Sequence, residues 1–173
     1  MKRIVTLLAL ACSLALAPAA FCADEAKLGS VDIQKVLVLS DAGKEAKEQL
    51  AACGNKYETE KNSREDELKK LKADLEKQSV LLSESARGAK EKDYQQKLKE
   101  YQRFLKDAQD DLQAKNDEFT NKIVEEIVKT IQEYGKQNGY SMIFVKNDSM
   151  IYLDGKVDLT DEILKAFNVV KKK

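Results

Sequence analysis

The segment "YSMIFVKNDSMIYLDGK", from Tyr140 to Lys156, decides how the fold is interpreted. Two short apolar runs, Met142–Val145 and Met150–Leu153, lie on either side of the turn-forming residues 146–149. This arrangement predicts a β-hairpin, because Asn, Asp and Ser favour tight turns between strands. Both runs are apolar at consecutive positions, so we expect both faces of each strand to be buried.

The hundred residues before this segment are rich in charge and follow a helical pattern. Apolar or small residues recur at helical spacing from about Asp41 to Leu82, and the period returns from Tyr94 to Tyr134. Between them, "SESARGAKEK" (residues 83–92) breaks the period, which indicates the turn of a helical hairpin or a helix end near it. The pattern predicts two antiparallel helices of roughly 40 to 45 residues each. They form a coiled-coil arm of residues 41–137 with its tip near 83–92.

The apolar stripe of the predicted arm is interrupted in its first helix. Between Tyr57 and Leu68 the stripe positions carry Lys61 and Arg64, which breaks the heptad spacing and would slacken the supercoil there. Charged residues four apart, such as Glu65 and Lys69, are expected to pair on a solvated helix face. Cys53 falls on the stripe, where we expect it to act as a small buried hydrophobe.

The residues outside the arm, 23–40 and 138–173, form a small head. We expect a strand over Lys27–Asp32, a short helix over Ile33–Leu39 and a last helix with Thr160 as its N-cap. Ser40 and Asp41 are good N-cap residues for the first arm helix. The fold class is therefore α+β, mostly α: a long antiparallel coiled-coil helical hairpin that projects from a β-containing head.

A core as small as that of the head is marginal alone, so we expect the head to oligomerise with copies of the same chain. Ile143 and Phe144 are neighbours on a strand and point to opposite faces, and the sequence leaves open which of them meets a partner chain. The residues expected in the oligomerisation head are Val31, Met142, Ile143, Phe144, Val145, Ile151 and Leu153.

The N-terminus has the pattern of a secretory signal peptide, assigned to residues 1–22. Lys2 and Arg3 form a basic start, an uncharged apolar run follows over 4–16, and small residues allow cleavage after Ala19 or after Cys22. The apolar run is shorter than the roughly 20 residues that span a bilayer. We therefore expect a periplasmic protein.

Composition excludes several classes of function. The chain has 30 basic and 30 acidic residues, and a nucleic-acid-binding protein would need a basic surface. Histidine is absent, which removes the commonest general base and metal ligand. Gly43 and Lys44 lack the spacing of a phosphate-binding loop. We expect no enzyme, no catalytic or metal site and no cofactor.

The whole mature chain resembles the Skp/OmpH family of periplasmic chaperones. The resemblance is carried by "LGSVDIQKVLVLSDAGKEA" (residues 28–46), by the charged helical hairpin and by "GYSMIFVKNDSMIYLDGKVDLTDEILKAFN" (residues 139–168). It implies a homotrimer whose heads form a β-barrel-like body, with three helical arms around a central cavity. It also implies an ATP-independent holdase that binds unfolded outer-membrane proteins and prevents their aggregation.

Under this resemblance, four arm residues are candidates for diffuse client contact: Phe104, one position off the apolar stripe, and Arg87, Lys90 and Lys92 at the predicted tip. The tip also carries acidic residues, so contact with a membrane or lipopolysaccharide is not carried over from the family. The alternative function is a structural coiled-coil spacer or scaffold protein of the cell envelope. The interrupted stripe favours arms that flex, which suits a holdase.

Overall fold

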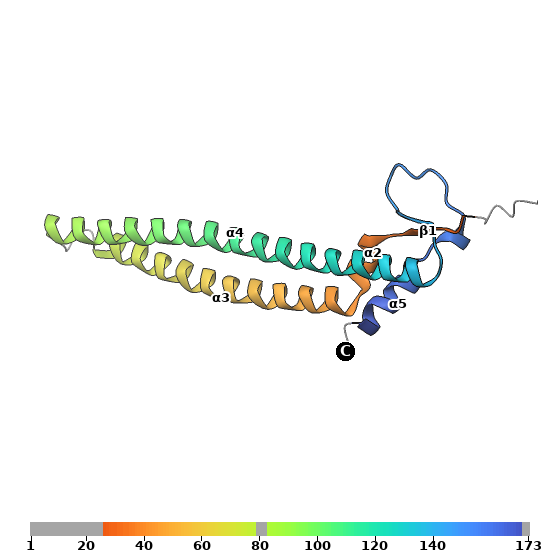
Figure 1. The fold of residues 1–173 in the computed structure, drawn as a ribbon. Helices are drawn as coiled ribbons and strands as arrows, with labels where there is room; N and C mark the ends of the chain where they lie inside the picture. The colour runs from red at the N-terminus through yellow and green to blue at the C-terminus, as the bar shows by residue number, and fades with distance from the viewer. Residues whose placement is uncertain (1–25, 79–82, 171–173) are drawn as a thin grey trace, which may run out of the picture.

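A computed structural model describes residues 26–78 and 83–170, which form a long helical arm on a small head (Figure 1). The predicted signal peptide lies outside the described residues. The α+β, mostly α fold class is confirmed. The elements in chain order are β1 (Leu28–Val31), α2 (Ile33–Leu39), α3 (Asp41–Gln78), α4 (Glu84–Gln137), β2 (Met142–Val145), the 3₁₀ helix η1 (Gly155–Val157) and α5 (Thr160–Val170).

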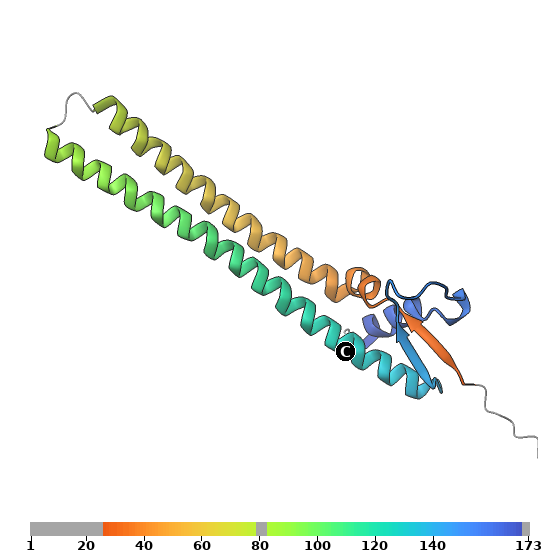
Figure 2. The same ribbon diagram turned by 90° about the horizontal axis from the view of Figure 1, so that it is seen from above.

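Helices α3 and α4 lie side by side and make the arm (Figures 1 and 2). They have 38 and 54 residues, or about 57 and 81 Å at about 1.5 Å per residue, so they are less equal than the sequence predicts. One reason is that α4 begins at Glu84, inside the segment 83–92 that the sequence pattern marks as a break. Ser83 caps it by accepting a hydrogen bond from the backbone N–H of Ala86 at 3.4 Å. The alternative of a helix end near this segment therefore holds, and residues 84–92 are helical.

The corner between α2 and α3 is built by Ser40 and Gly43. The Ser40 hydroxyl oxygen accepts from the backbone N–H of Gly43 at 3.0 Å, which confirms the predicted N-cap. A Cβ at Gly43 would lie 1.8 Å from the Leu37 carbonyl oxygen, so only glycine fits where the two helices meet. At the head end of the arm, α4 closes on Gly139, whose φ of 69° lets the Tyr140 N–H reach back to the Gly135 carbonyl at 3.0 Å.

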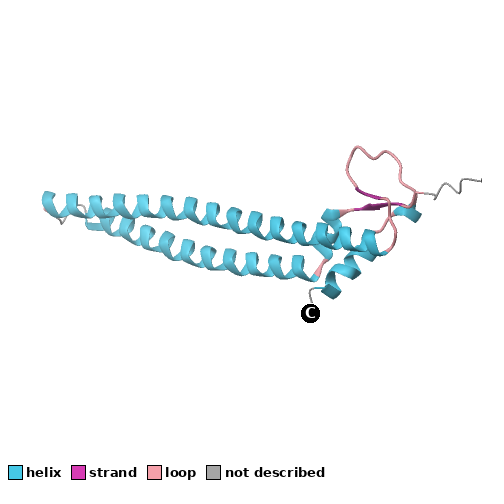
Figure 3. Ribbon diagram, viewed as in Figure 1, coloured by secondary structure: helices cyan, strands magenta, loops and turns pink. Residues whose placement is uncertain are grey.

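The sheet differs from the predicted hairpin. Strand β2 pairs with β1 in parallel, with Gly29 opposite Ile143, and residues 150–153 form no strand in the described chain. Figure 3 shows the two short strands at the head and the loop after β2 arching away from it. Parallel strands need a crossover connection, and here the whole arm is that connection. The Ile151 side chain is fully exposed and Tyr152 is 84% exposed, so the described residues leave the middle of the run 150–153 uncovered.

The head core lies where α2, α5 and the last turns of α4 meet one face of β1. Its buried residues are Val31, Val36, Ile123, Ile127, Leu159, Ile163 and Phe167. Ile123 and Ile127 come from α4, so the long helix of the arm continues into the head and supplies part of its core. Part of the predicted arm range 41–137 thus contributes to the core of the head.

Candidate functional site

Two tyrosines cross the interface between the arm helices in opposite directions. Tyr57 of α3 donates its hydroxyl proton to Asp111 of α4 at 2.7 Å, and Tyr101 of α4 donates to Glu65 of α3 at 2.6 Å. The apolar rings lie half-buried on the stripe, while the hydroxyls reach carboxylates at its edge. Glu65 therefore bonds to Tyr101, and the predicted pair of Glu65 with Lys69 is wrong: Lys69 lies 3.1 Å from Asp66.

These hydrogen bonds favour the neutral phenol and the ionised carboxylate. The bond to Asp111, together with burial, raises the pKa of Tyr57 to about 12. The same bond, with Lys115 at 3.1 Å, lowers the pKa of Asp111 below its usual value. Cys53 is half-buried beside them as a free thiol, its sulfur 4.0 Å from an Asp111 oxygen. The sequence pattern finds the tyrosines but not their partners, because Asp111 and Glu65 look like ordinary solvated charges.

Phe104 lies beside this polar contact and is half-buried rather than exposed. Its ring meets the Tyr57 ring edge-on with 6.1 Å between centroids, and the Arg64 guanidinium carbon lies 4.6 Å from its centre. Arg64 also pairs with Glu60 at 2.6 Å. The charged interruption of the apolar stripe is thus filled by a cation stacked on an aromatic ring.

An open space of about 410 Å³ adjoins Phe104 between the two helices. Gly54 leaves one side of it empty, because a Cβ at this position would meet no atom within 4 Å. Leu105 and Ala108 contribute apolar surface from α4. The arm therefore carries an apolar crevice on its surface, next to the one aromatic residue that the sequence analysis selected for client contact.

The three basic residues predicted at the tip lie in the first turns of α4. Arg87 is exposed and pairs with Glu91 on its own helix at 2.9 Å. Lys90 is half-buried and Lys92 is exposed. An acidic neighbour partly neutralises this group, as the mixed composition of the tip predicts, and the contact of these residues with a client stays a prediction.

The predicted oligomerisation residues divide between the two faces of the sheet. Val31 is fully buried in the core of its own chain, and Ile143 packs over Gly135 of α4, with its Cδ1 3.1 Å from where a Cβ would lie. Met142 and Phe144 point the other way and are 59% and 46% exposed, while Val145 at the strand end is half exposed. Ile151 is fully exposed and Leu153 is half-buried in the loop beyond. Within one chain β2 therefore buries only its Ile143 face, and the expectation that a partner chain covers the other face stays a prediction.

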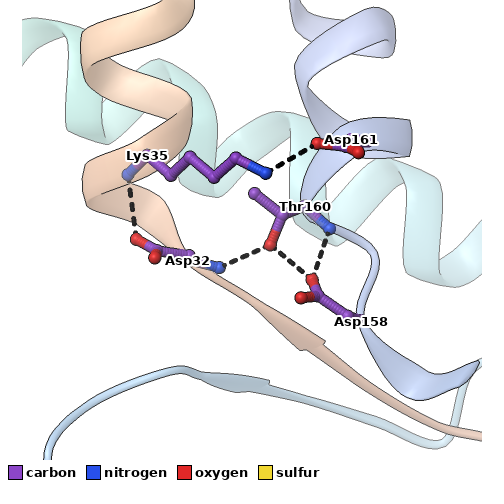
Figure 4. A network of polar contacts seen from close by, with 5 residues as sticks. All are labelled: Asp32, Lys35, Asp158, Thr160 and Asp161. Atoms are coloured by element: carbon purple, nitrogen blue, oxygen red, sulfur yellow. Dashed lines mark hydrogen bonds and ion pairs between the residues drawn. The ribbon is translucent and has the colours of Figure 1, made fainter. Parts of the chain in front are cut away.

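A polar network joins the start of α2 to the start of α5 (Figure 4). The Asp32 carboxylate accepts from the Lys35 N–H at 2.8 Å, and the Lys35 ammonium pairs with Asp161 at 3.0 Å. The Thr160 hydroxyl accepts from the Asp32 N–H and donates to Asp158, so Thr160 links two elements and is the first residue of α5 rather than its N-cap. Its bond lowers the pKa of Asp158. Each of these carboxylates has a hydrogen-bond or ion-pair partner in the head, so we interpret the cluster as a structural link between α2 and α5.

Comparison with known proteins identifies the family. The family model described as "Outer membrane protein (OmpH-like)" matches residues 27–167. A solved structure of a putative outer membrane chaperone (OmpH-like) from Caulobacter crescentus CB15 is similar in fold, with a TM-score of 0.79 and 15% identity over 84% of this chain and 85% of that one. No curated protein matches the sequence. Among the described helices, none has an apolar stretch that could cross a membrane. With the arm, the head and the matched range in agreement, the chain belongs to the Skp/OmpH family of OmpH-like proteins.

Proposed function

We propose that this protein is a periplasmic, ATP-independent holdase that binds unfolded outer-membrane proteins between helical arms and keeps them from aggregating. Family membership supports a chaperone for outer-membrane proteins in general. The observation that carries the finer proposal is the open apolar crevice at Phe104, on an arm that is rich in charged residues. Such a surface offers weak apolar contact to an unfolded chain while the complex stays soluble.

The proposal includes a homotrimer, and the outer face of β2 supports assembly. Met142 and Phe144 are large apolar side chains left exposed beside fully exposed Ile151. An exposed apolar strand at the edge of a sheet invites pairing with another chain. The number three follows from the family resemblance. Sedimentation equilibrium tests it, and a stable monomer at micromolar concentration contradicts it.

The holdase activity is tested by light scattering from an unfolded outer-membrane β-barrel protein diluted out of denaturant. We expect the protein to suppress scattering in proportion to its concentration, and added ATP to change nothing at matched ionic strength. A spacer protein, the alternative function, would leave the scattering unchanged. The predicted signal peptide supports the periplasmic location, which fractionation of cells expressing the full chain checks.

A further inference from the structure

The crevice at Phe104 continues along the arm toward the head. A second space, of about 220 Å³, is lined by Gly43 and Leu50 of α3 and by Phe119 of α4. On α3, the residues that line the two spaces run from Gly43 through Leu50 and Gly54 to Lys61, at steps of seven and four. Residues at these steps share one face of a helix. The two spaces are therefore parts of one groove on one face of the arm, which we call the arm groove.

The α4 side of the arm groove repeats the same spacing and has an uncommon edge. Its rim residues are Gln109, Gln113, Asn116 and Thr120, at steps of four and three. All four are uncharged in a chain of which 35% is charged. Side-chain amides both donate and accept hydrogen bonds. Gln113 uses one donor on Asp117 at 2.8 Å and keeps its amide oxygen as an acceptor. The groove thus combines an apolar floor with a hydrogen-bonding rail on α4, while Lys47, Glu58 and Lys61 line its α3 edge.

We propose that the arm groove binds a client segment in extended conformation, with alternate apolar side chains on the floor and backbone groups on the amide rail. This inference rests on the proposed chaperone function and names the form of client it recognises. From Gly43 to Lys61 the groove is about 27 Å long at about 1.5 Å per residue. At about 3.3 Å per residue, this length holds about eight residues of extended chain.

The rail argues for an extended occupant over a helical one. A helix satisfies its own backbone N–H and C=O groups, so Gln109 and Asn116 would have no backbone partner in it. An extended segment carries both groups unpaired, and an amide side chain can meet either. The strands of membrane β-barrels alternate apolar and polar residues, so every second side chain suits the floor. The groove therefore fits an unfolded strand of the client class that the family suggests.

The geometry is tested with a fluorescent peptide of about eight residues that alternates apolar and polar side chains. A photoreactive residue is placed at each peptide position in turn, and cross-links to the full-length protein are mapped by mass spectrometry. We expect groove cross-links at every second peptide position. Cross-links at three- and four-residue spacing show a helical occupant and overturn the proposal, as does the absence of groove cross-links.

Gly54 and Gly88 provide a matched pair of variants. Each lies inside a helix, and a Cβ at either would meet no atom within 4 Å, so Gly54→Gln and Gly88→Gln should both fold. Only Gly54→Gln places a side chain in the groove. We expect it to weaken peptide binding about tenfold, the loss for one excluded apolar side chain. Gly88→Gln should bind as the wild type does, and equal binding by the two variants overturns the proposal.

The rail is tested by Gln109→Glu, which keeps the shape of the side chain and removes its donors. Its control is Gln132→Glu, at an exposed position of α4 outside the groove with the same change in charge. We expect weaker binding of an uncharged peptide only in the first variant. Suppression of client aggregation is measured on the same proteins. If the wild type suppresses aggregation but Gly54→Gln and Gln109→Glu bind peptide normally, the groove proposal is wrong and the holdase proposal stands. If the wild type does not suppress aggregation, the holdase proposal is wrong.

Discussion

The head and the arm of this protein are each stabilised by a different kind of internal contact. In the head, Val36, Ile127 and Ile163 are completely buried, and several short elements share one apolar core. In the arm, Ala108 is the only buried apolar residue of the described parts of α3 and α4 above the head. The other contacts include half-buried leucines and aromatic rings, hydrogen bonds from Tyr57 and Tyr101 to carboxylates, the ion pair of Lys97 with Glu67, and the stack of Arg64 on Phe104.

From this difference we infer that the two arm helices separate more easily than the head unfolds. Each apolar side chain between α3 and α4 is mostly half-buried, so separating the helices exposes less new apolar surface per residue than unpacking the head, and water can replace the polar bonds. Unpacking the head exposes fully buried side chains and costs far more. Segments with few buried contacts are the ones that open locally. An arm that opens more easily than the head is consistent with the proposed holdase function.

The largest effect is expected from cutting a side chain out of the head core. Ile127→Ala removes a fully buried side chain and should lower the free energy of unfolding by about 2–5 kcal/mol. Leu112→Ala, at a half-buried position of the arm, should cost about 1 kcal/mol. Thermal unfolding followed by circular dichroism measures both. Equal losses would remove the distinction between the two regions.

The second prediction compares charged substitutions on the two faces of β2. Ile143→Asp places a charge against Gly135 and the head core, and should destabilise each chain by several kcal/mol. Phe144→Asp lies on the exposed face, so the chain should keep its helicity while the proposed oligomer dissociates, and its melting temperature should fall only by the stability that assembly adds. Lys146→Asp is the exposed control. Circular dichroism and sedimentation are read on all three, and an unchanged mass for Phe144→Asp contradicts assembly through this face.

The parts of the fold that follow from local patterns are predictable from the sequence. The helical period places α3 and α4, and the caps at Ser40 and Gly139 follow from backbone chemistry that acts over a few residues. The strand pairing is not local. Residues 150–153 and 28–31 are both plausible partners for Met142–Val145, and the choice depends on how the arm brings β1 beside β2 across more than a hundred residues.

The candidate site also has one part that local sequence patterns predict and another that they do not. Helical spacing marks Tyr57, Phe104 and the neighbouring apolar positions, because one face of a helix can be read from one chain segment. The partners of the tyrosines could not be found, since Asp111 and Glu65 are two of many carboxylates and only the register of α3 against α4 selects them. The groove depends on that register too, because each helix supplies only one wall.

The smallest expected effect tests whether the hydrogen bond from Tyr57 to Asp111 helps to hold the two arm helices together. The phenol of Tyr57 should titrate at about 12 in the folded protein, against about 10 in an unfolded chain, because its proton is held by Asp111. The raised value means that this bond stabilises the fold fully below about pH 10 and is lost as the pH rises through about 12. Tyrosinate absorbance should show this late transition, and Tyr57→Phe should reduce its amplitude by one phenol, because the hydrogen bond to Glu65 raises the pKa of Tyr101 as well. Tyr152→Phe, at a residue that is 84% exposed, should leave it unchanged. A late transition of undiminished amplitude in Tyr57→Phe would show that the Tyr57–Asp111 bond is open in solution, and that this bond does not help to hold the arm.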